Sequence, residues 1–184
     1  MTYTDTFQIP YFIVTLAEHT EIKETLLKII NEDEIPVKMD TYQNIYKTDF
    51  FESKKARLYY KIIMPLIDKS LRKFSGIIEY DKLVFDKRSN IWYQQYNKLN
   101  YHSWHHHGDA RWSIVYYVEL SEDSPGTQFK DCITSKYISP NVKEGDILIF
   151  PGWMLHRSPP NLSKKRKTII SCNFHYNGDH SVKV

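Results

Sequence analysis

Three histidines and an aspartate are concentrated in Trp104-His105-His106-His107-Gly108-Asp109, immediately before the apolar segment Trp112–Val118. These residue types are common metal ligands, and here they stand where a strand is expected to begin. In an extended chain, alternate side chains point to opposite faces, so His105, His107 and Asp109 share one face. This parity predicts that His107 and Asp109 can reach one metal ion, and it leaves His105 as an alternative ligand.

A further histidine, His156, follows the segment Lys143–Pro151, a turn and then an apolar strand that ends at a proline. Two imidazoles and one carboxylate that leave coordination positions open form an arrangement that binds iron(II). Arg166 comes ten residues after His156, at the start of the next apolar strand, where it can hold a carboxylate through two hydrogen bonds. Thr168 would face the same side as Arg166, two residues further on.

With these residues in order, Trp92–Tyr176 resembles the iron(II)/2-oxoglutarate-dependent oxygenases, in particular the prolyl-hydroxylase-like group and its small bacterial and phage members. In that family an H-x-D pair, a distal His and an Arg about ten residues beyond it carry iron and 2-oxoglutarate. The resemblance implies that these roles fall on His107, Asp109, His156 and Arg166. Some relatives have H-x-H instead, so the chain can also be read as His105-x-His107. Asp109 is expected to be the third ligand because a carboxylate favours iron(II), whereas three imidazoles suit zinc or copper as well, and His105 is the alternative.

The resemblance also implies the cofactors and the reaction. Iron(II), 2-oxoglutarate as co-substrate and dioxygen would together hydroxylate an unactivated C–H bond of a peptide side chain or a small metabolite. Tyr96 and Thr168 are expected to contact the co-substrate. A further set is expected to face the substrate: His105, Trp104 and Asn173.

The chain of 184 residues, of which 41% are hydrophobic, is long enough for one core and short for two domains, so a single domain over residues 1–184 is expected. From residue 76 onward it consists of short apolar stretches separated by turns, which is typical of an antiparallel sandwich. These stretches are 77–85, 89–96, 111–120, 128–131, 147–150 and 168–174. The resemblance supplies the topology: an α+β, mainly β, double-stranded β-helix, which is a cupin-like jelly roll.

Residues 1–75 are expected to form mainly helical support packed on the sheet. Residues 7–16 contain Pro10 and predict an edge strand. Thr20 is expected to cap a helix in which apolar residues recur at helical spacing as far as Ile30. A second, amphipathic helix is expected within residues 50–74, bent or divided at Pro65.

Composition excludes several classes of protein. The formal net charge is +3, and the basic residues are dispersed, which does not favour a nucleic-acid-binding face. No apolar run approaches the roughly 20 residues of a membrane helix, and the N-terminus lacks the features of a signal peptide, so a cytoplasmic protein is expected. Cys132 and Cys172 form no C-x-x-C pair and are expected to be reduced. The oligomeric state is left open.

Two alternatives remain at this stage. The first is a cupin-like metalloprotein that uses His105, His107 and His156 without 2-oxoglutarate. A cupin would add a glutamate a few residues after H-x-H, but position 111 is arginine and the next glutamate is Glu119. The second alternative is a non-catalytic jelly-roll binding module. Release of succinate from 2-oxoglutarate in the presence of iron(II) distinguishes the oxygenase from both.

Overall fold

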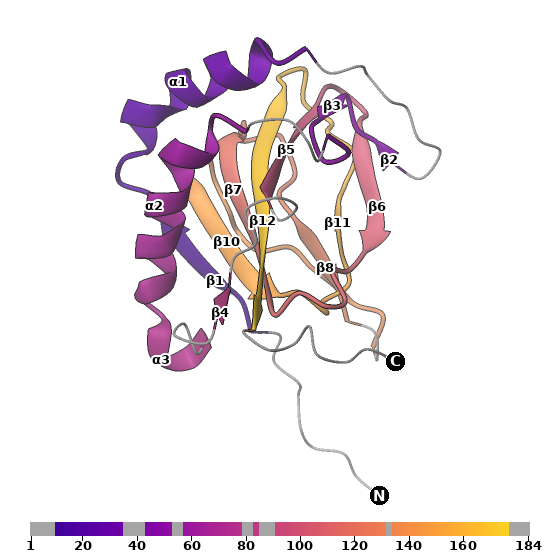
Figure 1. The fold of residues 1–184 in the computed structure, drawn as a ribbon. Helices are drawn as coiled ribbons and strands as arrows, with labels where there is room; N and C mark the ends of the chain where they lie inside the picture. The colour runs from indigo at the N-terminus through magenta and orange to yellow at the C-terminus, as the bar shows by residue number, and fades with distance from the viewer. Residues whose placement is uncertain are drawn as a thin grey trace, which may run out of the picture.

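Two β-sheets face each other, and three helices cover the outer face of the larger one (Figure 1). The computed structural model describes residues 10–34, 43–52, 57–78, 83–84, 91–131 and 134–176. The larger sheet has the strand order β1-β10-β7-β12-β5-β3, with β4 paired to β12, and the smaller sheet has the order β2-β6-β11-β8-β9. All pairs are antiparallel. The prediction of a double-stranded β-helix with N-terminal helices packed on a sheet is confirmed.

The larger sheet contains the most apolar strands of the chain. Its strands are β1 (Phe12–Thr15), β3 (Lys47–Thr48), β4 (Leu83–Val84), β5 (Ile91–Tyr96), β7 (Trp112–Glu119), β10 (Asp146–Pro151) and β12 (Lys167–Tyr176). The smaller sheet consists of β2 (Gln43–Asn44), β6 (Tyr101–His105), β8 (Gln128–Lys130), β9 (Tyr137–Ile138) and β11 (His156–Ser158).

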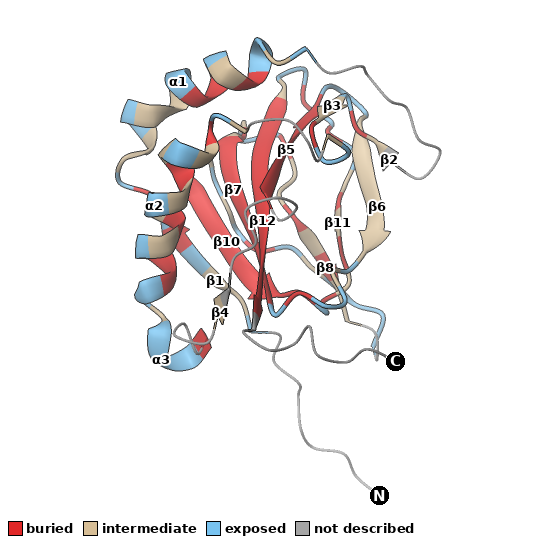
Figure 2. Cartoon of the chain, in the orientation of Figure 1, coloured by how far each residue is buried: buried red, intermediate tan, exposed pale blue. Residues whose placement is uncertain are grey.

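Alternation along the central strands divides the core into two layers. On β7, Ile114 and Tyr116 point to the helices, whereas Val115 and Tyr117 point between the sheets. The first layer joins the larger sheet to the helices, and the second fills the space between the sheets. Figure 2 shows that the residues of β7, β10 and β12 are buried along nearly their whole length, which explains why β7 and β10 consist mostly of apolar residues. β12 differs, because half of its residues are polar.

The helices are α1 (His19–Asn31), α2 (Tyr60–Arg72) and the short α3 (Ser75–Ile78). The edge strand expected over residues 7–16 is present as the shorter β1, which begins two residues after Pro10 and, in the described part of the chain, pairs only with β10. Residues 7–9 of the expected strand lie outside the described residues. The expectation that Thr20 caps α1 was wrong, because the helix begins at His19 after Glu18, whose side chain makes no capping hydrogen bond. Pro65 lies inside α2. None of the helices in the described ranges is long and apolar enough to span a membrane.

Candidate metal centre and cavity

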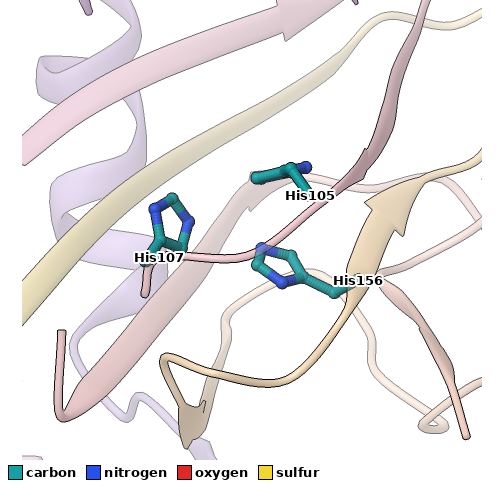
Figure 3. Close-up of side chains that lie close together, drawn as sticks. All are labelled: His105, His107 and His156. Carbon is teal, nitrogen blue, oxygen red and sulfur yellow. The ribbon is translucent and has the colours of Figure 1, made fainter. Parts of the chain in front are cut away.

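Three histidine side chains meet between the two sheets. His105, the last residue of β6, is paired with His156, the first residue of β11, and His107 follows after the end of β6. Each residue offers one ring nitrogen, and these nitrogens all lie within 4.8 Å of one another. Figure 3 shows the three side chains lying close together, with His107 on the coil beyond the end of β6. The structure therefore brings together His107 and His156, as the sequence predicted, and adds His105.

An irregularity in β6 determines which histidines face inward. His156 is paired with His105 but Ser158 with His102, so two steps along β11 correspond to three along β6. This bulge lets residues three apart on β6 share a face. As a result, the His102 ring lies inside the cavity, stacked on the His105 ring at 3.8 Å between centroids and 20° between planes.

Hydrogen bonds fix the tautomers of two of the three rings. His105 Nδ1 lies 2.7 Å from the Ser103 carbonyl oxygen, and His156 Nδ1 lies 2.8 Å from the Met154 carbonyl oxygen. A carbonyl oxygen only accepts, so in both rings Nδ1 carries the proton. The Nε2 lone pair of each ring is then free to bind a metal ion, as in metal-binding histidines whose other nitrogen donates to the backbone.

Burial keeps the three rings neutral. It lowers the pKa of His156 well below its ordinary value, and the neighbouring imidazoles lower it further. Burial and the neighbouring His105 lower the pKa of His107 to about 4, although the nearby Asp109 charge acts in the opposite direction. Burial also lowers the pKa of His105. Neutral imidazole is the form that binds metal ions, so the cluster is ready to do so at neutral pH.

Asp109, the carboxylate predicted from parity, is not part of this cluster. The extended backbone ends at His105, and Gly108 and Asp109 form a turn in which the Asp109 side chain is exposed. Its backbone carbonyl accepts a hydrogen bond of 3.0 Å from His175 Nδ1. The alternation of side chains along an extended strand, which predicted that Asp109 and His107 share a face, therefore stops before Asp109.

The histidine cluster opens into a cavity between the sheets, with about 360 Å³ of space that protein atoms do not fill, including the part open to solvent. Every second residue of two strands of the larger sheet faces the cavity. These residues are Trp92, Gln94 and Tyr96 from β5, and Ile169, Ser171 and Asn173 from β12. No aspartate or glutamate lines it in the described part of the chain.

A buried lysine lies behind the wall of the cavity, against two residues that line it, Ser158 and Tyr96. Lys167 is 1% exposed, and its Nζ donates hydrogen bonds to Ser158 Oγ at 2.6 Å and to the Pro125 carbonyl oxygen at 2.9 Å. Its Nζ also lies 4.8 Å from the centroid of the Tyr96 ring. No carboxylate forms an ion pair with Lys167 among the described residues, and burial lowers the pKa of this amine to about 7.

Tyr96, which the sequence placed near the co-substrate, is fully buried and lines the cavity beside this lysine. Its hydroxyl makes no hydrogen bond of good geometry to any described residue, although Ser158 is a close neighbour. A buried hydroxyl without a partner is costly, and a ligand oxygen in the cavity would satisfy it. Tyr96 is therefore brought to the site.

Arg166 and Thr168 are not brought to this cavity. The Arg166 guanidinium donates to both carboxylate oxygens of Glu119, and the Thr168 hydroxyl binds the same carboxylate and Gln95. Thr168 shares its parity with the β12 residues that face the helices, whereas Lys167 shares the parity of Ser171. The sequence analysis thus predicted Arg166 as the anchor, whereas the next residue, Lys167, is the one that points between the sheets.

Of the two other residues expected to face the substrate, Asn173 and Trp104, only Asn173 lines the cavity. Asn173 lines the cavity, where its Oδ1 accepts a hydrogen bond of 2.9 Å from Ser113. Trp104 does not line it; its ring stacks on Tyr137 at 5.4 Å between centroids, with the Arg157 guanidinium 4.5 Å from the Trp104 ring. Sequence reasoning did not place His102, Gln94 or Trp92 at the site. The parity of Lys167 with Asn173 is the signal that could have favoured Lys167 over Arg166 as the anchor.

Comparison with solved structures supports the assignment of the fold. A viral collagen prolyl hydroxylase from Paramecium bursaria Chlorella virus-1 in complex with 2OG matches with a TM-score of 0.63 and 17% identity, over 89% of this chain and 94% of that one. A Trichoplax adhaerens prolyl hydroxylase in complex with a hypoxia-inducible factor peptide fragment matches with a TM-score of 0.66 and 12% identity, over 95% and 87%. The α-ketoglutarate-dependent epimerase SnoN from nogalamycin biosynthesis matches with a TM-score of 0.68 and 10% identity, over 95% of this chain and 83% of that one. No protein-family model and no curated protein sequence matches the chain.

Proposed function

We propose that this protein is an iron(II)- and 2-oxoglutarate-dependent oxygenase. The observation that carries the proposal is a three-histidine cluster in the cavity of a jelly roll, together with a buried lysine that contacts two residues of the cavity wall, Ser158 and Tyr96. Among the described residues this lysine has no carboxylate partner. His156 and Ser158 are two residues apart on β11, so the histidines and the Lys167 amine are separated by roughly 7 Å along the strand. A short dicarboxylate that binds a metal ion at one end can reach the lysine with the other.

The donor set fits the metal ion. Three neutral imidazoles, two of them with Nε2 exposed to the cavity by their hydrogen bonds, supply three ligands and leave the remaining positions open. When bound there, iron(II) would supply the activation of dioxygen that couples conversion of 2-oxoglutarate to succinate and carbon dioxide with insertion of one oxygen atom into a substrate C–H bond.

Residues of this chain would bind and orient the co-substrate. The Lys167 ammonium, held by Ser158 and the Pro125 carbonyl, would pair with the distal carboxylate, and the Tyr96 hydroxyl would donate to the same group. The apolar walls formed by Val115, Phe150 and Ile169 exclude water from the space between the two ends. Arg166, the anchor expected from the sequence, would instead stabilise the fold through Glu119.

Two rivals are less consistent with this cavity. A cupin-like metalloprotein without 2-oxoglutarate would share the three histidines, but it gives the buried Lys167 amine no anion to bind. A non-catalytic binding module would not require three converging imidazoles, two of them with tautomers fixed by hydrogen bonds to backbone carbonyls. The substrate is proposed to be a peptide or a small molecule, by analogy with the peptide in the Trichoplax adhaerens complex and with the enzyme of nogalamycin biosynthesis.

The test is turnover of the co-substrate. Protein loaded with iron(II) under anaerobic conditions is mixed with 2-oxoglutarate labelled at C1 and exposed to dioxygen, and released carbon dioxide and succinate are counted. We expect slow release without added substrate, dependent on iron and abolished in His156→Ala. Binding of metal without any release would favour the cupin-like alternative, and failure to bind metal would favour the binding module.

A further inference from the structure

A series of aromatic rings leads from the histidine cluster to the protein surface. The Trp92 ring lies 5.6 Å from the His107 ring, and Trp92 lines the cavity while remaining only 4% exposed. The Phe50 ring meets the Trp92 ring edge-to-face at 5.1 Å, and the Phe51 ring meets the Phe50 ring in the same manner at 5.1 Å. Phe50 and Phe51 are 44% and 49% exposed. The aromatic surface that begins beside a candidate metal ligand thus ends in solvent.

The backbone around Phe50 is fixed by buried hydrogen bonds. The carboxylate of Asp49, which is 1% exposed, accepts from the Tyr93 backbone N–H at 2.8 Å and from the Tyr59 hydroxyl at 2.6 Å. Thr48 Oγ1 donates to the Tyr93 carbonyl oxygen at 2.7 Å and lies 3.2 Å from the Phe50 backbone nitrogen, which donates to it. The Phe50 ring is therefore presented to solvent from a rigid segment, and a ligand would not have to order it on binding.

The chemistry of this surface favours one kind of ligand. Phe50, Phe51 and Trp92 offer flat apolar faces without a charged group, and aromatic rings bind other rings by stacking or edge-to-face contact. The charge proposed to bind 2-oxoglutarate is that of Lys167, which contacts Ser158 and the Pro125 carbonyl and not these aromatic rings. A substrate that reaches the metal ion would pass Trp92, so the part of it that remains outside would rest on Phe50.

We infer that Phe50, backed by Trp92, is a specificity-determining residue that binds an apolar ring in the part of the substrate that stays outside the cavity, while the C–H bond that is oxidised reaches the metal site. This inference rests on the proposed function, because it takes the metal site to be the reacting centre. It limits the substrate class to peptides or small molecules that carry an aromatic or alicyclic ring. Acyclic, strongly charged compounds would bind this surface poorly.

The test uses indole as a probe ring and tert-butanol as an apolar probe without a ring. Full-length protein is loaded with manganese(II) and 2-oxoglutarate without oxygen, and probe binding is measured by ligand-observed NMR. A zinc-loaded sample reports binding without paramagnetic effects, and in the manganese sample enhanced relaxation of indole protons reports proximity to the metal. We expect indole, but not tert-butanol, to bind and to relax faster in the manganese sample.

Three variants make the test specific. Phe50→Leu keeps an apolar cover on Trp92 without a flat ring and should weaken indole binding at least fivefold, whereas Phe50→Tyr should retain it. Ile77→Ala removes a side chain that is 66% exposed on α3 and should change nothing. Each variant is first checked for an unchanged melting temperature and manganese content.

The outcomes separate this inference from the proposed function. Equal indole binding by wild type and Phe50→Leu, or equal binding of indole and tert-butanol, would overturn the role of Phe50 even if iron-dependent succinate release is observed. Indole binding that depends on Phe50 without relaxation by manganese would also overturn it, since the ring would then lie far from the metal. Loss of manganese binding by the wild type would instead count against the proposed function.

Discussion

Arg166 and Glu119 form an ion pair with two hydrogen bonds, from Arg166 Nε to Oε2 at 2.9 Å and from Nη2 to Oε1 at 3.2 Å. This two-point geometry engages two of the five guanidinium N–H donors, one for each carboxylate oxygen. The next residue, Lys167, points to the opposite side of the strand, into the wall of the cavity. Two adjacent cations thus have different partners, and only Lys167 is positioned to bind a ligand.

The first prediction separates these two cations. Lys167→Met keeps the length of the side chain but removes its charge, and it should weaken 2-oxoglutarate binding by about 10–100-fold, since a hydrogen bond to a charged group contributes roughly 1.5–3 kcal/mol. Arg166→Met should leave this affinity unchanged and lower the free energy of unfolding by about 1 kcal/mol, because its ion pair is partly exposed. Calorimetric titration of the zinc-loaded variants measures both affinities. The reverse ranking would return the anchor to Arg166.

Strand parity explains both what the sequence predicted and what it did not. The larger sheet was anticipated because its strands are buried on both faces and consist of continuous apolar runs such as Ile147–Phe150. Three strands of the smaller sheet, β6, β9 and β11, were not anticipated. Two of them carry the histidines of the site on their inner face, so their inward positions are polar and hydrophobic alternation is lost.

The third ligand could not be decided from spacing alone. His105 and Asp109 have the same parity relative to His107, and parity holds only while the backbone is extended. The end of β6 at His105 and the turn at Gly108 are tertiary outcomes, set in part by the hydrogen bond of 2.8 Å from the His107 N–H to the Gly152 carbonyl oxygen. The two residues therefore differ in the fold although they are equivalent in the sequence pattern.

The second prediction concerns this ligand. His105→Ala should reduce the affinity for divalent metal by more than the roughly 10–100-fold typical of outer-shell changes, because it removes one of three converging imidazoles. Asp109→Ala should keep metal affinity close to that of the wild type, since its side chain is exposed. Cobalt(II) titration followed by visible absorption measures both. Retained binding in His105→Ala together with loss in Asp109→Ala would restore the H-x-D assignment.

The third prediction concerns Gly152, which holds His107 in position. A Cβ atom at Gly152 would lie 2.2 Å from the Ala110 carbonyl oxygen, a contact with backbone that no side-chain rotation relieves. Gly152→Ala should therefore lower the free energy of unfolding by about 1–3 kcal/mol and weaken metal binding by displacing the carbonyl that binds the His107 N–H. Thermal unfolding and cobalt titration measure the two effects.

Gly76→Ala is the matched control for this change. No atom lies within 4 Å of a Cβ atom at Gly76, which belongs to α3, so an alanine there should be neutral or stabilising by up to about 1 kcal/mol. Equal effects of the two substitutions would show that Gly152 is not required for close approach of the two segments.

The last prediction follows from the pKa of Lys167, which burial lowers to about 7. The distal carboxylate of 2-oxoglutarate binds the protonated amine, and the bound anion raises the pKa of that amine again. Below pH 7 the free protein already carries the proton, so affinity should be nearly independent of pH. Above pH 7 the free amine loses its proton and binding must restore it. Affinity should then fall by about tenfold per pH unit, and binding should take up close to one proton at pH 8. Calorimetry in two buffers with different ionisation enthalpies, on zinc-loaded protein, counts this proton directly. Lys167→Met should bind weakly without proton uptake, whereas uptake that persists in this variant would assign the titration to another group.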